Sequence, residues 1–257
     1  MDPNERTAPA ACVVIPCYNE AGRLDRAALL ELADDDAVEL LFVDDGSTDT
    51  TGSMLAELAA SSSSISVLTL RANAGKAEAV RQGMAAALTR GTELVAYYDA
   101  DLATPPDELL RLVGVLAASP WLQCVMGSRV ALLGTAIDRR AFRHYVGRVF
   151  ASAASVALGI TVYDTQCGAK VFRAGPALTA ATARPFTSGW AFDVELLDRL
   201  LRGSDTVAPM PLDELVEAPL RSWNDVPGSQ VHLGGAALAL ASVGKIGVAR
   251  WRRTRAR

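Results

Sequence analysis

The chain has 257 residues, half of them hydrophobic, which is enough to bury the core of one large domain or of one domain with an appendage. The net charge of −4 is unevenly distributed, because residues 245–257 are basic and contain no acid while the rest carries 19 basic and 29 acidic residues. This acidic body excludes a typical nucleic-acid-binding surface. Four cysteines without a CxxC pair, and only two histidines, argue against a zinc site and predict a cytoplasmic chain with reduced thiols.

Short β-rich runs alternate with helical patterns along most of the chain. Residues 1–9 are polar and proline-containing, so we expect a disordered tail. The alternation from residue 10 to 230 predicts an α/β domain with a doubly wound, mostly parallel sheet and helices on both faces. Ligands of such sheets bind beyond the carboxyl ends of the strands. The first four strands are expected at 11–15, 39–43, 65–70 and 94–98, with helices at 22–33, around 54–58 and at 77–88.

The fourth strand ends in two carboxylates, Asp99 and Asp101. Side chains at positions i and i+2 of a strand point to the same side, so the two acids can converge on one point. Mg²⁺ or Mn²⁺ bound to both carboxylates and to a substrate's phosphates would relieve their repulsion. The plainer interpretation is a solvated acidic turn, because Asp-X-Asp is a common tripeptide.

Polar residues also follow the three preceding strands, and all four clusters are expected on one rim. Asp44 or Asp45 can accept a ring N–H of a nucleobase, and Lys76 at a glycine turn can meet a phosphate. The structural alternative makes Asp44 and Asp49 helix caps and Lys76 a solvated residue. We prefer the cap for Asp49, the nucleotide role for Asp44 and, less strongly, the phosphate role for Lys76. A dinucleotide-binding Rossmann domain is disfavoured because no GxGxxG follows the first strand.

These motifs resemble the donor-binding half of the inverting family 2 glycosyltransferases, which have the GT-A fold. The similarity rests on Val13-Val-Ile-Pro-Cys-Tyr-Asn-Glu20, Phe42-Val-Asp-Asp-Gly-Ser-Thr-Asp49, Asn73-Ala-Gly-Lys76 and Asp99-Ala-Asp101. Later segments resemble the narrower branch of dolichyl-phosphate β-glucosyltransferases and related polyprenyl-phosphate glycosyltransferases. These segments are Gly127-Ser-Arg129, Asp164-Thr-Gln-Cys-Gly-Ala-Lys170-Val-Phe172 and Trp190-Ala-Phe-Asp-Val-Glu-Leu196.

The resemblance implies roles for individual residues. The nucleoside pocket would be lined by Pro16, Tyr18, Glu20 and Asp44. Asp99 would lie beside the ribose and the metal, and Asp101 would bind Mg²⁺ or Mn²⁺ on the donor diphosphate. One position departs from the mannosyltransferase pattern, because Ala103 stands where a metal-binding glutamine is found. The third protein ligand is therefore left open.

The second half supplies cations and candidates for sugar contact. A basic run beside a cleft suits a phosphate monoester, and the resemblance favours Arg129 together with one of Arg139, Arg140 and Arg143 for the acceptor phosphate. The alternative is a solvated basic face on a helix. The resemblance also makes Gln166, Trp190 and Asp193 candidates for contacting the hexose. Asp193 would act as the base if the acceptor were a neutral hydroxyl.

Residues 231–257 predict a C-terminal amphipathic basic helix. The segment is near membrane-spanning length, but its alanines and glycines make it only mildly hydrophobic. We expect it to lie at the membrane interface, with the protein peripheral on the cytoplasmic face. An ordinary helix packed on the domain is the alternative.

The predicted function is transfer of a hexose from a nucleotide sugar to a polyprenyl phosphate of the dolichyl type, with inversion. The preferred donor is UDP-glucose, and GDP-mannose is less favoured. Two alternatives stay open. One is the same fold acting on a soluble hydroxyl acceptor, and the other is a non-catalytic nucleotide-sugar binding module.

Overall fold

The computed structural model describes residues 11–138, 141–226 and 233–255, with side-chain positions left undescribed at 141–144, 233–237 and 254. The expected tail at 1–9 and the arginines Arg139 and Arg140 lie outside these ranges. Arg143 lies inside a described helix, but its side chain is not described.

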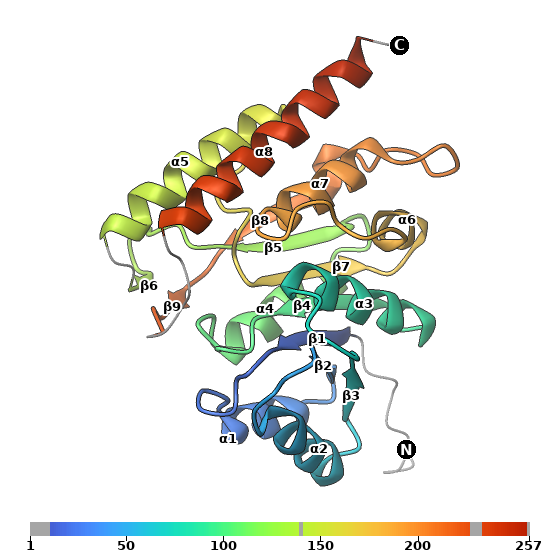
Figure 1. The fold of residues 1–257 in the computed structure, drawn as a ribbon, viewed down its shortest axis with the longest axis vertical. Helices are drawn as coiled ribbons and strands as arrows, with labels where there is room; N and C mark the ends of the chain where they lie inside the picture. The colour runs from blue at the N-terminus through green and yellow to red at the C-terminus, as the bar shows by residue number, and fades with distance from the viewer. Residues whose placement is uncertain (1–10, 139–140, 227–232, 256–257) are drawn as a thin grey trace.

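A seven-stranded sheet forms the centre of the molecule, in the order β3-β2-β1-β4-β7-β5-β8 (Figure 1). Six strands run parallel and β7 is antiparallel to both of its neighbours. The predicted mostly parallel sheet is therefore confirmed. Its strands are β1 (Ala11–Cys17), β2 (Val38–Asp44), β3 (Ile65–Thr69), β4 (Leu94–Tyr98), β5 (Cys124–Ser128), β7 (Ala169–Arg173) and β8 (Leu215–Pro219).

Helices cover both faces of this sheet, as the alternating pattern predicts. Residues of β1 face opposite layers in turn: Val14 packs in the layer of α3, whereas Val13 and Ile15 pack in the layer of α1, α2 and α4. The helices are α1 (Arg26–Ala33), α2 (Thr51–Ser61), α3 (Lys76–Thr89), α4 (Pro106–Ala117), α5 (Ala141–Leu158), α6 (Pro176–Thr182), α7 (Phe192–Arg202) and α8 (Leu233–Thr254). A 3₁₀ turn at Leu212–Glu214 precedes β8, and β6 (Ala136–Ile137) pairs with β9 (Ser222–Trp223) outside the main sheet.

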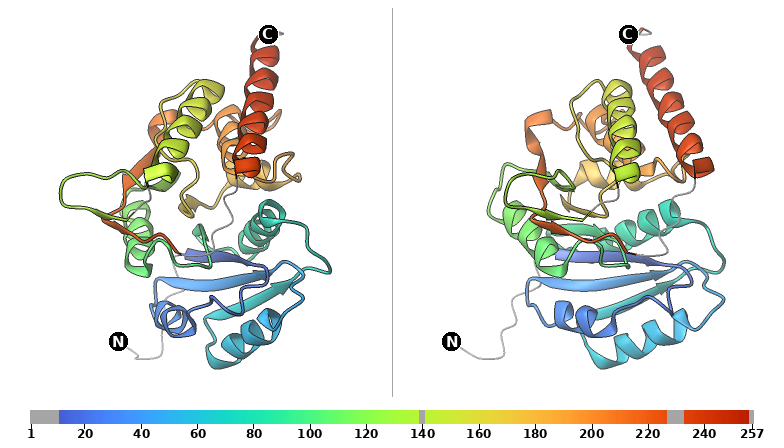
Figure 2. Two further views of the ribbon diagram at one scale, coloured as in Figure 1. Left: turned by 60° about the vertical axis from the view of Figure 1, so that its left-hand side comes forward. Right: turned by 90° about the vertical axis from the view of Figure 1, so that its left-hand side faces the viewer.

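The last helix packs beside α5 on the side of the molecule remote from α1 and α2 (Figures 1 and 2). Gly247 of α8 lies against Ala157 of α5, where an added Cβ would come within 3.2 Å of the alanine methyl. Ala239, Val243 and Ile246 of α8 are buried in the core that also contains Phe150 and Ala154 of α5. The predicted C-terminal helix is thus present, and one face of it belongs to the core of the domain.

Parallel register aligns the carboxyl ends of the first strands. Cys17 at the end of β1 is opposite Asp44 at the end of β2, and Asp44 is opposite Thr69 at the end of β3. β4 is parallel to β1, with Val14 opposite Tyr97. The segments that follow these four strands therefore emerge at one edge of the sheet, which is the rim that the sequence predicts.

Gly83 sets the distance between α3 and the sheet, which gives a test of the packing. A Cβ at this buried position would lie 2.3 Å from Val14 Cγ1 and 2.7 Å from Val43 Cγ2. We expect Gly83→Ala to destabilise the protein by about 1–3 kcal/mol through overpacking. The matched control is Gly114→Ala in α4, where a Cβ meets nothing within 4 Å. Its expected effect is a stabilisation of up to about 1 kcal/mol from helix propensity. Urea unfolding measures both, and equal effects of the two variants would contradict this packing.

Candidate active site

The end of β4 places the polar side chains of Tyr97 and Asp99 on the same side of the sheet. Tyr97 faces the layer of α3, whereas Tyr98 faces the opposite layer. Asp99 lies two residues after Tyr97 and donates its backbone N–H to the carbonyl of Gly168 at 2.9 Å. Gly168 has no room for a side chain, because a Cβ there would lie 2.1 Å from Asp99 Oδ2. The position of the Asp99 carboxylate therefore depends on a glycine at 168.

Two lysine–aspartate pairs flank the ring of Tyr97. Lys76 Nζ lies 2.7 Å from Asp99 Oδ1, and Lys170 Nζ lies 2.6 Å from Asp193 Oδ1. The ring of Tyr97 lies beneath both ammonium groups, with its centroid 5.6 Å from Lys76 Nζ and 5.0 Å from Lys170 Nζ. The first pair is partly exposed, whereas the second is almost completely buried. Removing one member of such a buried pair costs about 3–5 kcal/mol, because the other charge is left uncompensated.

The pKa values of the three carboxyls in this region, Asp99, Asp193 and Asp101, shift in different directions. Burial raises the pKa of Asp99, but the Lys76 ammonium and hydrogen bonds from Lys76 and Tyr97 outweigh it, so the net pKa is lowered. Burial dominates at Asp193 and raises its pKa despite the Lys170 ammonium. Burial and then the charge of Asp99 raise the pKa of Asp101. Asp99 is therefore the most firmly ionised of the three.

A cavity of about 700 Å³ opens beside these residues. It brings together seven residues that the sequence singled out, which are Lys76, Asp99, Asp101, Arg129, Gln166, Trp190 and Asp193. Its other walls include Tyr97, Tyr163, Phe192 and Trp223, and residues of α5 and α8. Segments from positions 75 to 239 thus meet around a single space, although they are distant in sequence.

Asp101 and Asp99, the carboxylates that the sequence predicts for a metal ion, both line the cavity. Asp101 accepts the backbone N–H of Ala103 at 3.1 Å, across Leu102, whose φ of 52° is unusual for a non-glycine residue. Among the described residues no group of three or more His, Cys, Asp or Glu side chains is arranged to hold a metal. Mg²⁺ and Mn²⁺ are often bound by one or two carboxylates together with phosphate oxygens and water. The pair fits such an ion only if a ligand such as a diphosphate completes the coordination.

The residues after β1 and β2 lie outside the lining of the cavity, at the neighbouring part of the rim. The structure gives Asp45 a structural task, since its carboxylate accepts the backbone N–H groups of Ala74 at 2.7 Å and Gly75 at 2.8 Å. It also accepts the side-chain amide of Asn73 at 3.1 Å. Asp45 therefore holds the loop that carries Lys76, and its predicted contact with a nucleobase stays a prediction.

Asp44 and Glu20 also have partners within the protein. Asp44 is buried and accepts the backbone N–H of Ser47 through Oδ1 at 3.0 Å. Glu20 forms a bidentate pair with Arg23 at 2.7 and 2.8 Å. Asp49 accepts the N–H of Thr51 at 2.9 Å, as expected for a residue that supports the start of a helix.

Tyr18 and Pro16 complete the predicted nucleoside side. Tyr18 exposes its ring to solvent, and Pro16 lies in β1 opposite Val43. Asn19, between Tyr18 and Glu20, joins this turn to the next. Its Oδ1 accepts the N–H of Thr48 at 2.9 Å, and its φ is 53°. The role of Asn19 was missed, although asparagine is the non-glycine residue that most readily adopts a positive φ.

Arg129 is held by an acid. Its Nε and Nη2 donate to the two carboxylate oxygens of Asp164 at 2.6 and 2.8 Å. The guanidinium also lies 5.4 Å from the ring centroid of Trp223. Arg129 lines the cavity with this bidentate pair already formed, and its predicted contact with an acceptor phosphate stays a prediction.

The segment 164–170 is joined to the segment 190–193 by Gln166 and Lys170. Gln166 donates its side-chain amide to the carbonyl of Trp190 at 3.1 Å, which leaves the Trp190 indole half exposed at the cavity. Cys167 is buried between these groups, and burial raises the pKa of its thiol to about 11, as expected for a structural cysteine. The sequence assignment missed Lys170 and Tyr97. A lysine inside an otherwise apolar strand was the signal for Lys170.

Comparison with known proteins identifies the family. The model of the family described as "Glycosyl transferase family 2" matches residues 12–177, which run from β1 into α6. The chain belongs to glycosyl transferase family 2. The match includes the ends of all four parallel strands that form the rim, so the predicted family is confirmed.

Curated relatives of this family 2 chain belong to the predicted branch. The dolichyl-phosphate beta-glucosyltransferase of Trichomonas vaginalis is 30% identical over 240 residues, covering 86% of this chain and 66% of that protein. The enzyme of that name from Saccharomyces cerevisiae is 29% identical over 255 residues, covering 89% and 71%. The polyprenol monophosphomannose synthase of Mycolicibacterium smegmatis is 28% identical over 218 residues, covering 82% and 77%. The chain thus spans about two thirds to three quarters of the length of these relatives.

Solved structures confirm the GT-A fold. The UDP complex of glucosyl-3-phosphoglycerate synthase from Mycobacterium tuberculosis superimposes with a TM-score of 0.66 and 22% identity, covering 94% of this chain and 81% of that chain. The complex of the same protein with Mn²⁺, UDP and glucosyl-3-phosphoglycerate gives a TM-score of 0.64 at 23% identity, with the same coverage. At this level of identity the likeness establishes the fold and nothing finer.

Substitution of Gly168 tests whether the position of the Asp99 carboxylate requires the absence of a side chain at residue 168. The Cβ of Gly168→Ala would displace the Asp99 carboxylate, so we expect binding of Mn²⁺ together with UDP to weaken by at least about tenfold, as for loss of a charge-assisted contact. Gly22→Ala is the control, because a Cβ at that exposed position meets nothing within 4 Å. Titration calorimetry measures both variants. Unchanged binding by Gly168→Ala, with the fold intact, would contradict the predicted role of Asp99 beside a metal ion and a diphosphate.

Proposed function

We propose that this family 2 chain transfers a hexose from a nucleotide sugar to a polyprenyl phosphate. The observation that carries the proposal is one cavity whose walls combine the Asp99 and Asp101 carboxylates with arginines and with apolar residues of α5. Carboxylates with a metal ion suit a donor diphosphate. Arginine suits a phosphate monoester, and an apolar wall suits a hydrocarbon chain.

The proposed donor is UDP-glucose. Several relatives are named dolichyl-phosphate beta-glucosyltransferases, and the structurally similar synthase was crystallised with UDP-glucose and Mn²⁺. GDP-mannose is the less favoured donor, supported by the relative named polyprenol monophosphomannose synthase. Asp44, Tyr18 and Pro16, at the ends of neighbouring parallel strands, are the residues proposed for the nucleoside.

The divalent ion would be held by Asp101 and Asp99, and when bound it would neutralise charge on the departing diphosphate. Lys76 begins α3, where its ammonium and the positive end of the helix dipole can stabilise the same negative charge. Asp45 keeps this helix start in place through the loop at 73–75.

A phosphate acceptor simplifies the chemistry. One of its oxygens is already anionic at neutral pH and can attack the anomeric carbon while the bond from that carbon to the diphosphate oxygen breaks. Direct displacement inverts the configuration, and the protein's main task is to align the two reactants. No strong base is needed. Asp193, whose Oδ1 is paired with Lys170, is therefore better suited to contact a sugar hydroxyl than to act as a base.

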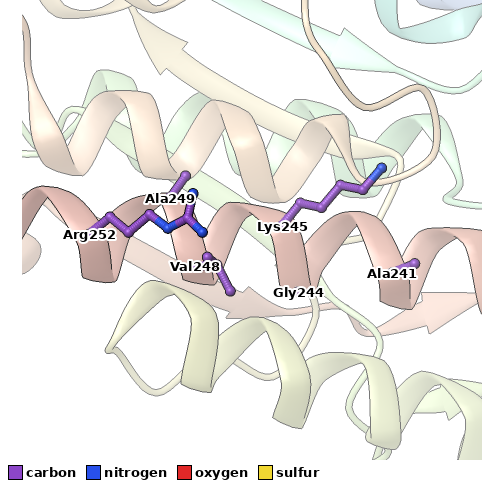
Figure 3. Close-up of a pocket in the computed structure, with 6 residues that line it drawn as sticks. All are labelled: Ala241, Gly244, Lys245, Val248, Ala249 and Arg252. Carbon is purple, nitrogen blue, oxygen red and sulfur yellow. The ribbon is translucent and has the colours of Figure 1, made fainter.

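We further propose that α8 contacts an anionic membrane surface. Leu238, Val248 and Trp251 expose about half or more of their surface. In Figure 3 the side chains of Lys245, Val248 and Arg252 lie along one shallow surface of this helix. Arg250 is paired with Asp198 at 3.1 Å, which leaves the neighbouring arginines for lipid headgroups. In the described part of the chain, no helix combines the length and apolarity needed to cross a bilayer.

The central test is transfer of label from UDP-[¹⁴C]glucose to a polyprenyl phosphate in the presence of Mn²⁺. We expect an organic-extractable product whose sugar is β-linked by NMR. Asp101→Asn should lower kcat by about a hundredfold or more, since it removes charge that holds the metal and diphosphate. The exposed Asp205→Asn is the matched control. If the wild-type chain binds UDP-glucose but transfers label to no acceptor, it is a binding module rather than an enzyme.

Flotation on liposomes tests the membrane contact. The double variant Arg252→Glu/Arg253→Glu should recover less protein with phosphatidylglycerol vesicles than the wild type, because each basic residue near an anionic surface contributes about 1 kcal/mol. The control is Arg184→Glu/Arg221→Glu, which makes the same charge change at two exposed positions elsewhere. Equal recovery of all three proteins would contradict a role for α8.

A further inference from the structure

Among the residues that the structure describes, three cations line the cavity, and they differ in their partners. Lys76 is paired with Asp99 and Arg129 with Asp164. The third is Arg148 of α5, which forms no ion pair with a carboxylate among the residues that the structure describes. A cation that faces a cavity without an internal counter-ion is the group best placed to receive an anion from outside.

The guanidinium of Arg148 is positioned by an aromatic ring. Its central carbon lies 4.8 Å from the ring centroid of Tyr163, which also lines the cavity. Tyr163 is anchored in turn, because its backbone N–H donates to the Glu217 carboxylate of β8, as does that of Asp164 at 2.7 Å. Stacking on a ring holds the plane of a guanidinium and leaves its N–H edge available, which suits bidentate contact with phosphate.

Apolar residues surround Arg148 on the same wall. Val146 and Phe150 of α5 line the cavity, together with Val130 and with Ala239 of α8. Gly147 and Ala151, four residues apart on α5, also line it and leave space along the helix because their side chains are small. A phosphate bound at Arg148 would therefore have an apolar surface beside it for whatever group the phosphate carries.

We propose that Arg148 binds the acceptor phosphate and that the adjoining apolar wall selects a phosphate carrying a hydrocarbon chain over a small polar phosphate. This inference rests on the proposed function and adds the residue and the surface that determine acceptor specificity. Arg148 is also absent from the set predicted by sequence, which contains Arg129, Arg139, Arg140 and Arg143. Arg129 already holds Asp164, and in this view it helps to shape the site rather than supplying the main contact.

Steady-state kinetics with geranyl phosphate and UDP-glucose test the role of Arg148. Arg148→Gln should raise the KM for geranyl phosphate by about 10- to 100-fold, the effect of losing hydrogen bonds to a charged group, with the KM for UDP-glucose unchanged. Arg148→Lys should raise the KM for geranyl phosphate by a smaller factor, because an ammonium keeps the charge but cannot donate two parallel N–H bonds to one phosphate. Arg184→Gln is the control, since this exposed arginine does not line the cavity. A geranyl phosphate KM within twofold of the wild type in Arg148→Gln would overturn the assignment.

Comparison of two acceptors tests the apolar wall. The wild type should use geranyl phosphate at least about tenfold more efficiently than glycerol 3-phosphate, as the burial of several CH₂ groups implies. Val146→Asn should reduce that ratio without changing binding of UDP by calorimetry. A wild type that uses both acceptors equally would overturn the selectivity. Failure of the wild type to transfer glucose to either one, with UDP-glucose still bound, would instead overturn the proposed function.

Discussion

The site depends on the pairing of charges around Tyr97. Lys170 and Asp193 are almost completely buried 2.6 Å apart, and two such charges survive away from water only because each compensates the other. The pair connects β7 to the first turn of α7, and the ring of Tyr97 separates it from the Lys76–Asp99 pair at the start of α3. These contacts fix the start of α3, the end of β4 and the start of α7 relative to one another.

The cavity beside these two ion pairs has two sides with different chemistry. One side is formed by the segments that follow β3 and β4, and it carries the carboxylates and the loop that Asp45 holds. The other is built from α5, α8 and residues 163–168, and its α5 and α8 residues are apolar except for Arg148. Antiparallel β7 lies between β4 and β5 and delivers Gly168 and Lys170 to the boundary. The reaction proposed here would take place where the two sides meet.

The first half of the chain could be predicted well because its signals are local. Strands β1 to β4 read as apolar runs that end at polar turns, and each polar turn falls at the same edge once the strands are parallel. The predicted strand at residues 94–98 matches β4 in full. The assignment of individual side chains was less complete. Asp45 and Arg129 have the residue types that bind ligands, yet both use their polar atoms on partners in the protein.

The sequence by itself determined the fold class, the family and the pair of carboxylates at the end of β4, because these follow from periodicity and from short contiguous motifs. Only the tertiary structure decided which charges neutralise one another and which remain for a ligand. The partners Lys76 and Asp99, Arg129 and Asp164, and Arg148 and Tyr163 are 15 to 35 residues apart in the chain. These partners come into contact only when the helices pack on the sheet, and a local pattern of residues does not specify contacts between such distant positions in the chain.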